Sequence, residues 1–211
     1  MASIAPGQEG RPLRSTEEVR ISYDLQADES YIKKLENPFF EKYGRAVGEY
    51  LADREPKDVL EVGCGDGFTL GYVEEETGVQ CAGLDLSQKR LAYARTRTKA
   101  RLFQGDMFDL PFRESQFDVV YTSHALEPNG GREKEALREL WRVARRYLIL
   151  FEPDYDRASK LGKKRMRRLG YVTNLRRHIA ALEYPLAEYR PFVTGNALNP
   201  TSVFCIWKGA A

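Results

Sequence analysis

Three acidic side chains stand where short apolar runs end along the chain. Glu61 belongs to the apolar run 58–62, and Asp85 and Asp106 follow the next two runs. Ligands gather at the carboxyl ends of parallel strands, so these carboxylates are expected to lie together. Asp85 can accept two hydrogen bonds from a ribose diol, and Asp106 can accept one from an adenine amino group while the Met107 N–H meets a ring nitrogen. The strand ends therefore predict a nucleoside-like ligand.

A glycine turn follows the first of these runs and opens a helix. Gly63, Gly65 and Gly67 let the backbone approach a ligand closely, and N–H groups at a helix N-terminus can hold its carboxylate. The alternative is a dinucleotide site, whose GxGxxG fingerprint would require glycine at position 68. That position is Phe68, so the spacing disfavours NAD.

A histidine and a glutamate after the fourth apolar run are the residues best suited to move a proton. His124, with an unperturbed pKa of about 6.5, can take a proton from a hydroxyl or a carbon acid. Glu127 can orient that imidazole or bind a substrate cation. The alternative is that His124 only contacts the cofactor or hydrogen-bonds within its loop. No group of residues has the spacing of a metal site.

Alternating strands and helices must position these residues. The predicted strands are 58–62, 79–84, 101–104, 117–121 and 147–151. One predicted helix follows the glycine turn and ends at about residue 76, and two others cover 88–98 and 133–144. Repeated β-α units favour a parallel, doubly wound sheet. A basic helical stretch is expected over 157–183. Two further strands, 187–193 and 202–207, have no helix between them and are expected to pair antiparallel at the sheet edge.

The chain is expected to fold as one α/β domain with helical additions. Its 211 residues, 42% apolar and 30% charged, have an ordinary globular composition. Residues 1–14 are expected to be a mobile tail, and residues 15–53 a helical cap or lid that opens with a capping box at 15–18. Residues 54–211 then form the sheet domain, in which 153–200 are expected to contribute the substrate pocket.

Charge and cysteine content narrow the functional classes. The net charge is +2, so the chain as a whole is no obvious binder of polyanions. Three separated cysteines without a CxxC pair predict reduced thiols. The N-terminus lacks a secretory pattern, and no apolar stretch reaches the roughly 18–20 residues of a membrane span. We therefore expect a soluble, cytoplasmic protein, of an oligomeric state that the sequence leaves open.

The stretch 157–177 carries nine Lys or Arg residues and no acidic residue. A solvated basic helix is the simpler interpretation. The alternative is a site for a phosphorylated small molecule, a carrier-bound substrate or RNA. RNA is the weaker choice, because Tyr171 is the only aromatic side chain of the stretch that could stack on bases.

Four segments together resemble the class I S-adenosylmethionine (SAM)-dependent methyltransferases, in the branch typified by the ubiquinone/menaquinone-biosynthesis enzymes. They are EVGCGDG (61–67), GLDLS (83–87), QGDMFDLPF (104–112) and FDVVYTSHALEP (117–128). In addition, YDLQA (23–27) resembles an N-terminal element that helps to close over the cofactor. The resemblance covers about residues 20–152. It implies a Rossmann-like, seven-stranded, mostly parallel sheet with an antiparallel last strand.

The resemblance also implies a cofactor, a reaction and a site. SAM would be the cofactor and S-adenosylhomocysteine (SAH) the product. The methyl group would pass directly to a small-molecule acceptor, anionic or phosphorylated if the basic stretch binds it, with oxygen favoured as the acceptor atom and nitrogen or carbon left open. Glu61, Gly63 and Gly65 would surround the methionine part of SAM, and His124 and Glu127 are the catalytic candidates.

The cofactor candidates are Tyr23, Glu61, Gly63, Cys64, Gly65, Asp85, Leu86, Asp106, Met107 and Ser123. Two alternatives to a small-molecule enzyme stay open. One is an RNA or protein methyltransferase, although no nucleic-acid or membrane partner is expected. The other is a non-catalytic SAM-binding partner of an active homologue, against which the retained carboxylates and His124 argue.

Overall fold

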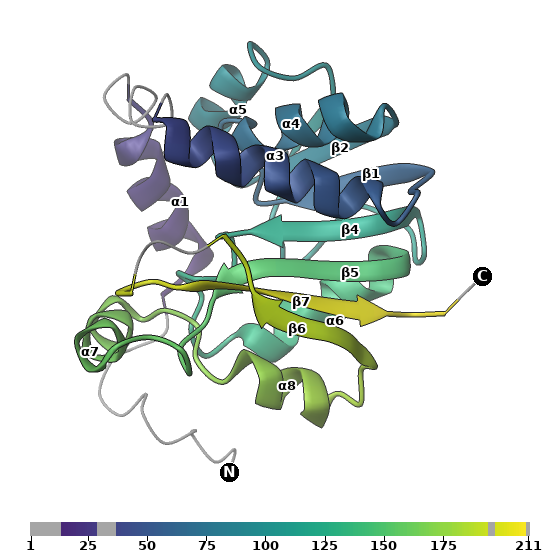
Figure 1. The fold of residues 1–211 in the computed structure, drawn as a ribbon. Helices are drawn as coiled ribbons and strands as arrows, with labels where there is room; N and C mark the ends of the chain where they lie inside the picture. The colour runs from purple at the N-terminus through teal and green to yellow at the C-terminus, as the bar shows by residue number, and fades with distance from the viewer. Residues whose placement is uncertain (1–13, 29–36, 194–196, 210–211) are drawn as a thin grey trace.

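The computed structural model describes residues 14–28, 37–193 and 197–209. Seven strands form one sheet in the order β3-β2-β1-β4-β5-β7-β6 (Figure 1). Their bounds are β1 (Asp58–Val62), β2 (Gln80–Asp85), β3 (Arg101–Gln104), β4 (Phe117–Ser123), β5 (Ala144–Pro153), β6 (Leu186–Pro191) and β7 (Thr201–Trp207). The first five strands pair in parallel, and β7 runs antiparallel to both β5 and β6. The predicted fold class, including the antiparallel last strand, is confirmed.

Helices cover both faces of this sheet (Figure 1). They are α1 (Thr16–Gln26), α3 (Pro38–Ala52), α4 (Phe68–Thr77), α5 (Gln88–Ala94), α6 (Glu133–Val143), α7 (Lys160–Leu169) and α8 (Leu175–Ala181). Alternate strand residues point to opposite layers. Val59 and Val119 pack with the α3, α4 and α5 layer, while Leu60 and Val120 pack with the α6 and α8 layer, and all four are 0% exposed.

Both N-terminal helices begin at a capping residue, and for α1 this is the predicted capping box. Ser15 caps α1 in a complete capping box with Glu18, and Asn37 caps α3 ahead of Pro38. The tail predicted for residues 1–14 lies outside the described residues apart from Arg14. Within the described ranges, no helix is long and apolar enough to cross a bilayer. All three cysteines are buried and form no disulfide.

Two predicted helices are shorter in the structure. The helix expected over 88–98 ends at Ala94 and continues as turns. The basic helix expected over 157–183 is two helices, because Gly170 adopts φ +68° at the end of α7 and Asn174 adopts φ +58° before α8. A left-handed residue ends an α-helix, so the break follows from local backbone geometry.

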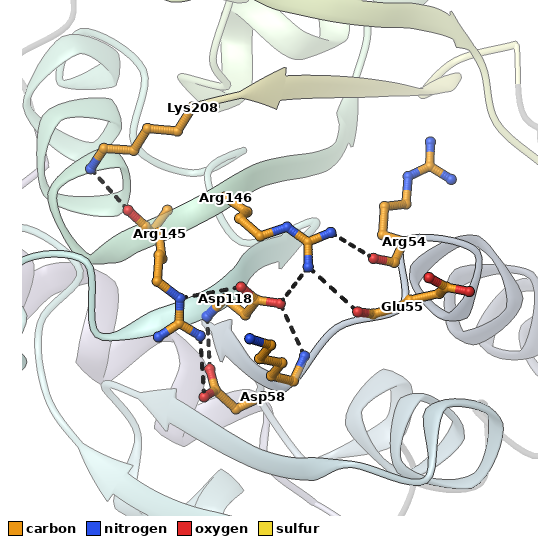
Figure 2. A network of polar contacts seen from close by, with 9 residues as sticks. Arg54, Glu55, Asp58, Asp118, Arg145, Arg146 and Lys208 are labelled. Atoms are coloured by element: carbon orange, nitrogen blue, oxygen red, sulfur yellow. Dashed lines mark hydrogen bonds and ion pairs between the residues drawn. The ribbon is translucent and has the colours of Figure 1, made fainter. Parts of the chain in front are cut away.

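An ion-pair network around the buried Asp118 lies at the amino-terminal ends of β1, β4 and β5 (Figure 2). Asp118, 1% exposed, accepts hydrogen bonds from Arg145 Nε (3.2 Å), Arg146 Nη1 (2.9 Å) and the Lys57 backbone N–H (3.0 Å). The Asp118 N–H donates to Asp58 Oδ1 over 2.7 Å. The network therefore fixes the three strands relative to one another at the ends where they begin.

Candidate functional site

A cavity of about 620 Å³ lies at the carboxyl ends of the parallel strands. Its walls contain all twelve residues predicted for the site, which are Tyr23, Glu61, Gly63, Cys64, Gly65, Asp85, Leu86, Asp106, Met107, Ser123, His124 and Glu127. Helices α1 and α3 add further residues, and so does the chain between 169 and 201. The structure therefore brings the predicted residues together, and their individual roles stay predictions.

The glycine turn has the geometry that only glycine adopts without strain. Gly63 and Gly65 have φ of +78° and +55°, and a Cβ on Gly63 would collide with the Ala125 side chain. The N–H groups of Gly63 and Cys64 donate to the Leu84 carbonyl over 2.7 and 3.0 Å. The turn is thereby tied to β2, the strand that carries the next carboxylate.

Asp85 is held at the end of β2 by two backbone groups. Its carboxylate accepts from the Gly65 N–H and from the Ser87 N–H, each over 2.8 Å. Burial raises the pKa of Asp85, and both hydrogen bonds oppose that shift. A carboxylate has about four lone-pair sites, so two remain for a ligand's diol.

Glu61 is a buried carboxyl group at the back of the cavity, 1% exposed. Thr69 Oγ1 donates to it over 2.5 Å, and the Tyr121 hydroxyl over 2.7 Å. Burial raises the pKa of Glu61 to about 8, and the nearby negative charge of Asp66 adds to the increase. Glu61 therefore holds a proton at neutral pH unless a cation enters the cavity.

Helix α1 touches two of the strand ends through its own side chains. Thr16 Oγ1 donates to Asp106 Oδ2 over 2.9 Å, and Ser87 Oγ donates to Asp24 Oδ1 over 2.5 Å. Tyr23 lies between these two contacts in sequence and lines the cavity. The helix therefore covers the half of the cavity that contains Asp85 and Asp106.

His124 uses both of its ring nitrogens. Nδ1 lies 3.1 Å from Glu127 Oε2, and Nε2 lies 2.9 Å from Thr201 Oγ1. Burial lowers the pKa of His124, but the hydrogen bond and charge of Glu127 and the charge of Glu152 outweigh it, so the pKa is raised above 6.5. A hydroxyl compound that binds at Nε2 would therefore take the place of the Thr201 hydroxyl.

Glu152, at the carboxyl end of β5, is a functional candidate that the sequence analysis missed. It is 0% exposed, and its Oε1 accepts from the N–H groups of Ala125 and Leu126 over 3.0 and 3.1 Å. These bonds hold the loop in which His124 adopts φ +54°. An acidic residue at the end of the fifth strand was the available signal, since the same signal singled out the other strand ends.

Two cavity residues come from segments that the motifs do not cover. The Tyr43 hydroxyl on α3 lies 2.9 Å from Ser123 Oγ, and its ring packs edge-on against His124. Thr201, at the start of β7, reaches His124 across 77 positions of sequence. No local pattern marks either residue as part of a site.

The fold resembles solved methyltransferase structures, and part of the sequence matches a methyltransferase family. Magnesium protoporphyrin IX methyltransferase from Synechocystis, solved with bound SAH, superposes with a TM-score of 0.71 at 15% identity, covering 92% of this chain and 100% of that one. Residues 60–150 match the methyltransferase domain family. The predicted resemblance to class I SAM-dependent methyltransferases is therefore confirmed for residues 60–150, and for the rest of the chain the comparison shows the fold.

Curated methyltransferases align with part of this chain. Norajmaline N-methyltransferase of Rauvolfia serpentina is 35% identical over 98 residues, which is 43% of this chain and 33% of that protein. Malonyl-[acyl-carrier protein] O-methyltransferase of Pectobacterium atrosepticum is 35% identical over 111 residues, 50% of this chain and 43% of that protein. The chain thus spans less than half the length of these relatives.

The lining of the cavity suits a cofactor that carries positive charge. Its acidic side chains are Glu61, Asp66, Asp85, Asp106 and Glu127, and its guanidinium groups are those of Arg14 and Arg90. SAM brings a sulfonium, an ammonium and a carboxylate group and is positive overall, whereas NAD brings two phosphates. Because charges interact strongly in a partly buried cavity, the excess of acidic over guanidinium groups, which persists with Glu61 protonated, favours SAM and opposes NAD.

Proposed function

We propose that this chain transfers a methyl group from SAM to a small-molecule acceptor, most favourably to a hydroxyl oxygen. The observation that carries the proposal is that a single cavity joins three strand-end carboxylates to the paired His124 and Glu127. The relatives include both an N- and an O-methyltransferase, so their names do not choose the acceptor atom.

For the cofactor half we propose one role for each strand end. Asp85 accepts the ribose hydroxyls, Asp106 and the Met107 N–H hold the adenine, and Glu61 lies with the glycine turn around the methionine part. Tyr23, Cys64, Leu86 and Ser123 complete the wall. The lone pairs left on Asp85 and the acidic lining support this assignment.

For the acceptor half we propose that His124 is the base. SAM supplies a methyl group already activated by its sulfonium charge, so the chain mainly has to position the acceptor and remove its proton. The acceptor hydroxyl displaces Thr201 from Nε2 and gives its proton to that nitrogen. Glu127 stays bonded to Nδ1 and stabilises the imidazolium that forms.

The segment 153–200 is proposed to shape the acceptor pocket, and residues 15–53 to act as its lid. Leu169, Tyr171 and Asn199 line the cavity from the first segment. Thr16 and Asp24 hold the second against the strand ends. The three buried thiols support the proposal of a reducing, cytoplasmic location.

Binding and turnover test the two halves separately. SAM and SAH should raise the Tm, by an amount equivalent to about 2.7 kcal/mol at 100 times Kd, and NAD should not. A screen of small-molecule acceptors with methyl-labelled SAM should then transfer label to at least one hydroxyl compound. A thermal shift with NAD alone would overturn the cofactor assignment. SAM binding without transfer to any acceptor would favour a non-catalytic SAM-binding partner.

A further inference from the structure

The basic stretch forms an outward-facing stripe on α7 and just before it. Arg157, Lys160, Lys164 and Arg167 are all exposed. The last three lie along one side of α7 because they are spaced by four and three residues, and Arg157 lies in the turn just before the helix. The opposite side of α7 is anchored, because Gly162 and Met166 are buried. We call these four cations the α7 stripe.

The α7 stripe is not neutralised within the described part of the chain. None of its four members has a carboxylate within ion-pair distance there. Arg167 donates a hydrogen bond to the Tyr155 hydroxyl, and the neighbouring Lys163 and Arg165 lie 5.5 Å from the ring centres of Tyr155 and Tyr171. No described carboxylate cancels the positive charge of the stripe, and its four exposed side chains can meet an anionic partner from solvent.

The stripe lies outside the cavity but next to it. No Lys or Arg of 157–177 is among the described residues that line the cavity. However, Leu169, the last residue of α7, and Tyr171 just beyond it both line the cavity wall. A small phosphorylated acceptor inside the cavity would not touch the stripe, whereas a larger acidic body could rest on α7 while its cargo enters the cavity.

We propose that the α7 stripe docks an acidic protein that carries the methyl acceptor, as a tethered group, to the cavity. The delivery of the tethered acceptor to the cavity rests on the proposed function, whereas the docking of the carrier protein does not. Leu161 stands 66% exposed beside Lys160 and gives the contact an apolar centre with a charged rim. This arrangement is typical of protein interfaces, in which exposed rim charges mainly guide association and register.

Two other polyanions fit the stripe less well. RNA recognition uses aromatic faces for stacking, but the rings of Tyr155 and Tyr171 already lie under Lys163 and Arg165. A lipid surface needs several bulky apolar anchors, and Leu161 is the only exposed large apolar side chain on α7. An acidic protein surface needs one apolar contact and a row of cations, which is what α7 presents.

Binding assays with three labelled probes test the proposal. The probes are an acyl carrier protein, as a small acidic protein with a tethered cargo arm, a 20-nucleotide oligouridine RNA, and phosphatidylglycerol vesicles. The full chain should bind the carrier protein most tightly, and raising the salt should weaken that binding steeply, since charges are screened over about 8 Å at physiological salt. Tighter binding of the RNA or the vesicles would overturn the proposal.

Charge reversal locates the contact. The variant Arg157→Glu, Lys160→Glu, Lys164→Glu should weaken carrier-protein binding at least tenfold. The matched control Lys42→Glu, Arg95→Glu, Lys99→Glu makes the same change in net charge at exposed positions on and near α3 and α5, and should change binding less than threefold. Equal losses in both variants would mean that net charge, not the stripe, attracts the probe, and would overturn the proposal.

The thermal shift given by SAM shows whether a variant still folds and binds the cofactor, independently of docking. Both triple variants should keep the thermal shift given by SAM, because none of the six positions lines the cavity. If the stripe variant keeps this shift and loses the carrier protein, docking is supported whether or not methyl transfer is detected. If it keeps both the shift and the wild-type affinity for the carrier protein, the docking proposal fails while the proposed function stands.

Discussion

We predict that the buried carboxyl of Glu61 makes SAM binding depend on pH, and that a single substitution removes this dependence. Without ligand, burial holds the pKa of Glu61 at about 8. A bound ammonium or sulfonium group next to this carboxyl favours its charged form and lowers the pKa. SAM binding near pH 7 should therefore release up to one proton, and the affinity for SAM should rise up to tenfold per pH unit below about pH 8.

The same group sets a pH slope on the ligand-free protein. The folded state holds the proton more tightly than the unfolded state, where the pKa is the ordinary 4.5. Stability contributed by the protonated group is therefore complete below pH 4.5 and is lost as pH rises toward 8. At about 1.36 kcal/mol per pKa unit, the loss by pH 7 amounts to about 3 kcal/mol.

Glu61→Gln and Glu152→Gln form a matched pair for this test. Both carboxyls are fully buried, and burial also raises the pKa of Glu152, to about 7, but Glu152 does not line the cavity. Either substitution should flatten the fall of the unfolding free energy between pH 5 and 8. Only Glu61→Gln should abolish the proton release, measured by titration calorimetry in two buffers of different ionisation enthalpy. Equal proton release in wild type and Glu61→Gln would refute the assignment.

Three further substitutions test the proposed roles. Asp85→Ala should weaken SAM binding by about 1.5–3 kcal/mol, as for hydrogen bonds to a charged group, and an unchanged Kd in calorimetry would contradict the ribose assignment. His124→Ala should lower kcat by about 10²–10⁴-fold with the Kd of SAM nearly intact. The wild-type kcat should rise with pH through a pKa above 6.5. Loss of SAM binding in the variant would make His124 a cofactor contact. Thr201→Val frees Nε2 and should change kcat only a few fold in steady-state kinetics, whereas a loss as large as that of His124→Ala would give the Thr201 hydroxyl a part in proton transfer.

Features that depend on neighbours in sequence were predictable, and features that depend on distant segments were not. The run of strand, glycine turn and helix at 58–77 follows from local pattern, and so does the position of Asp85 at the end of its strand. The partner of His124 Nε2 comes from β7, and the loop that carries His124 is fixed by β5. Neither contact leaves a trace in local spacing, because both depend on which strands become neighbours.

The break between α7 and α8 shows a different limit. Charge and helical periodicity continue across 157–183, but Gly170 takes a left-handed conformation that ends α7. Glycine adopts that conformation at little cost, yet it also occurs within helices, so the residue alone does not decide between the two. Packing ends the helix here, because Tyr171 lines the cavity and Val172 is buried in the core.

The hydrogen bond between His124 and Thr201 joins the part of the chain that matches the methyltransferase domain family to a part beyond that match. His124 lies within 60–150, the stretch shared with other methyltransferase domains, whereas Thr201 lies beyond it. Tyr171 and Asn199, which also line the cavity, lie outside that stretch as well. If the proposed roles hold, the matched part carries most of the groups that bind the methyl donor, and substitutions beyond it can change the acceptor while leaving those groups in place. Exchanging the segment after β5 between relatives is accordingly the most direct route to altered specificity.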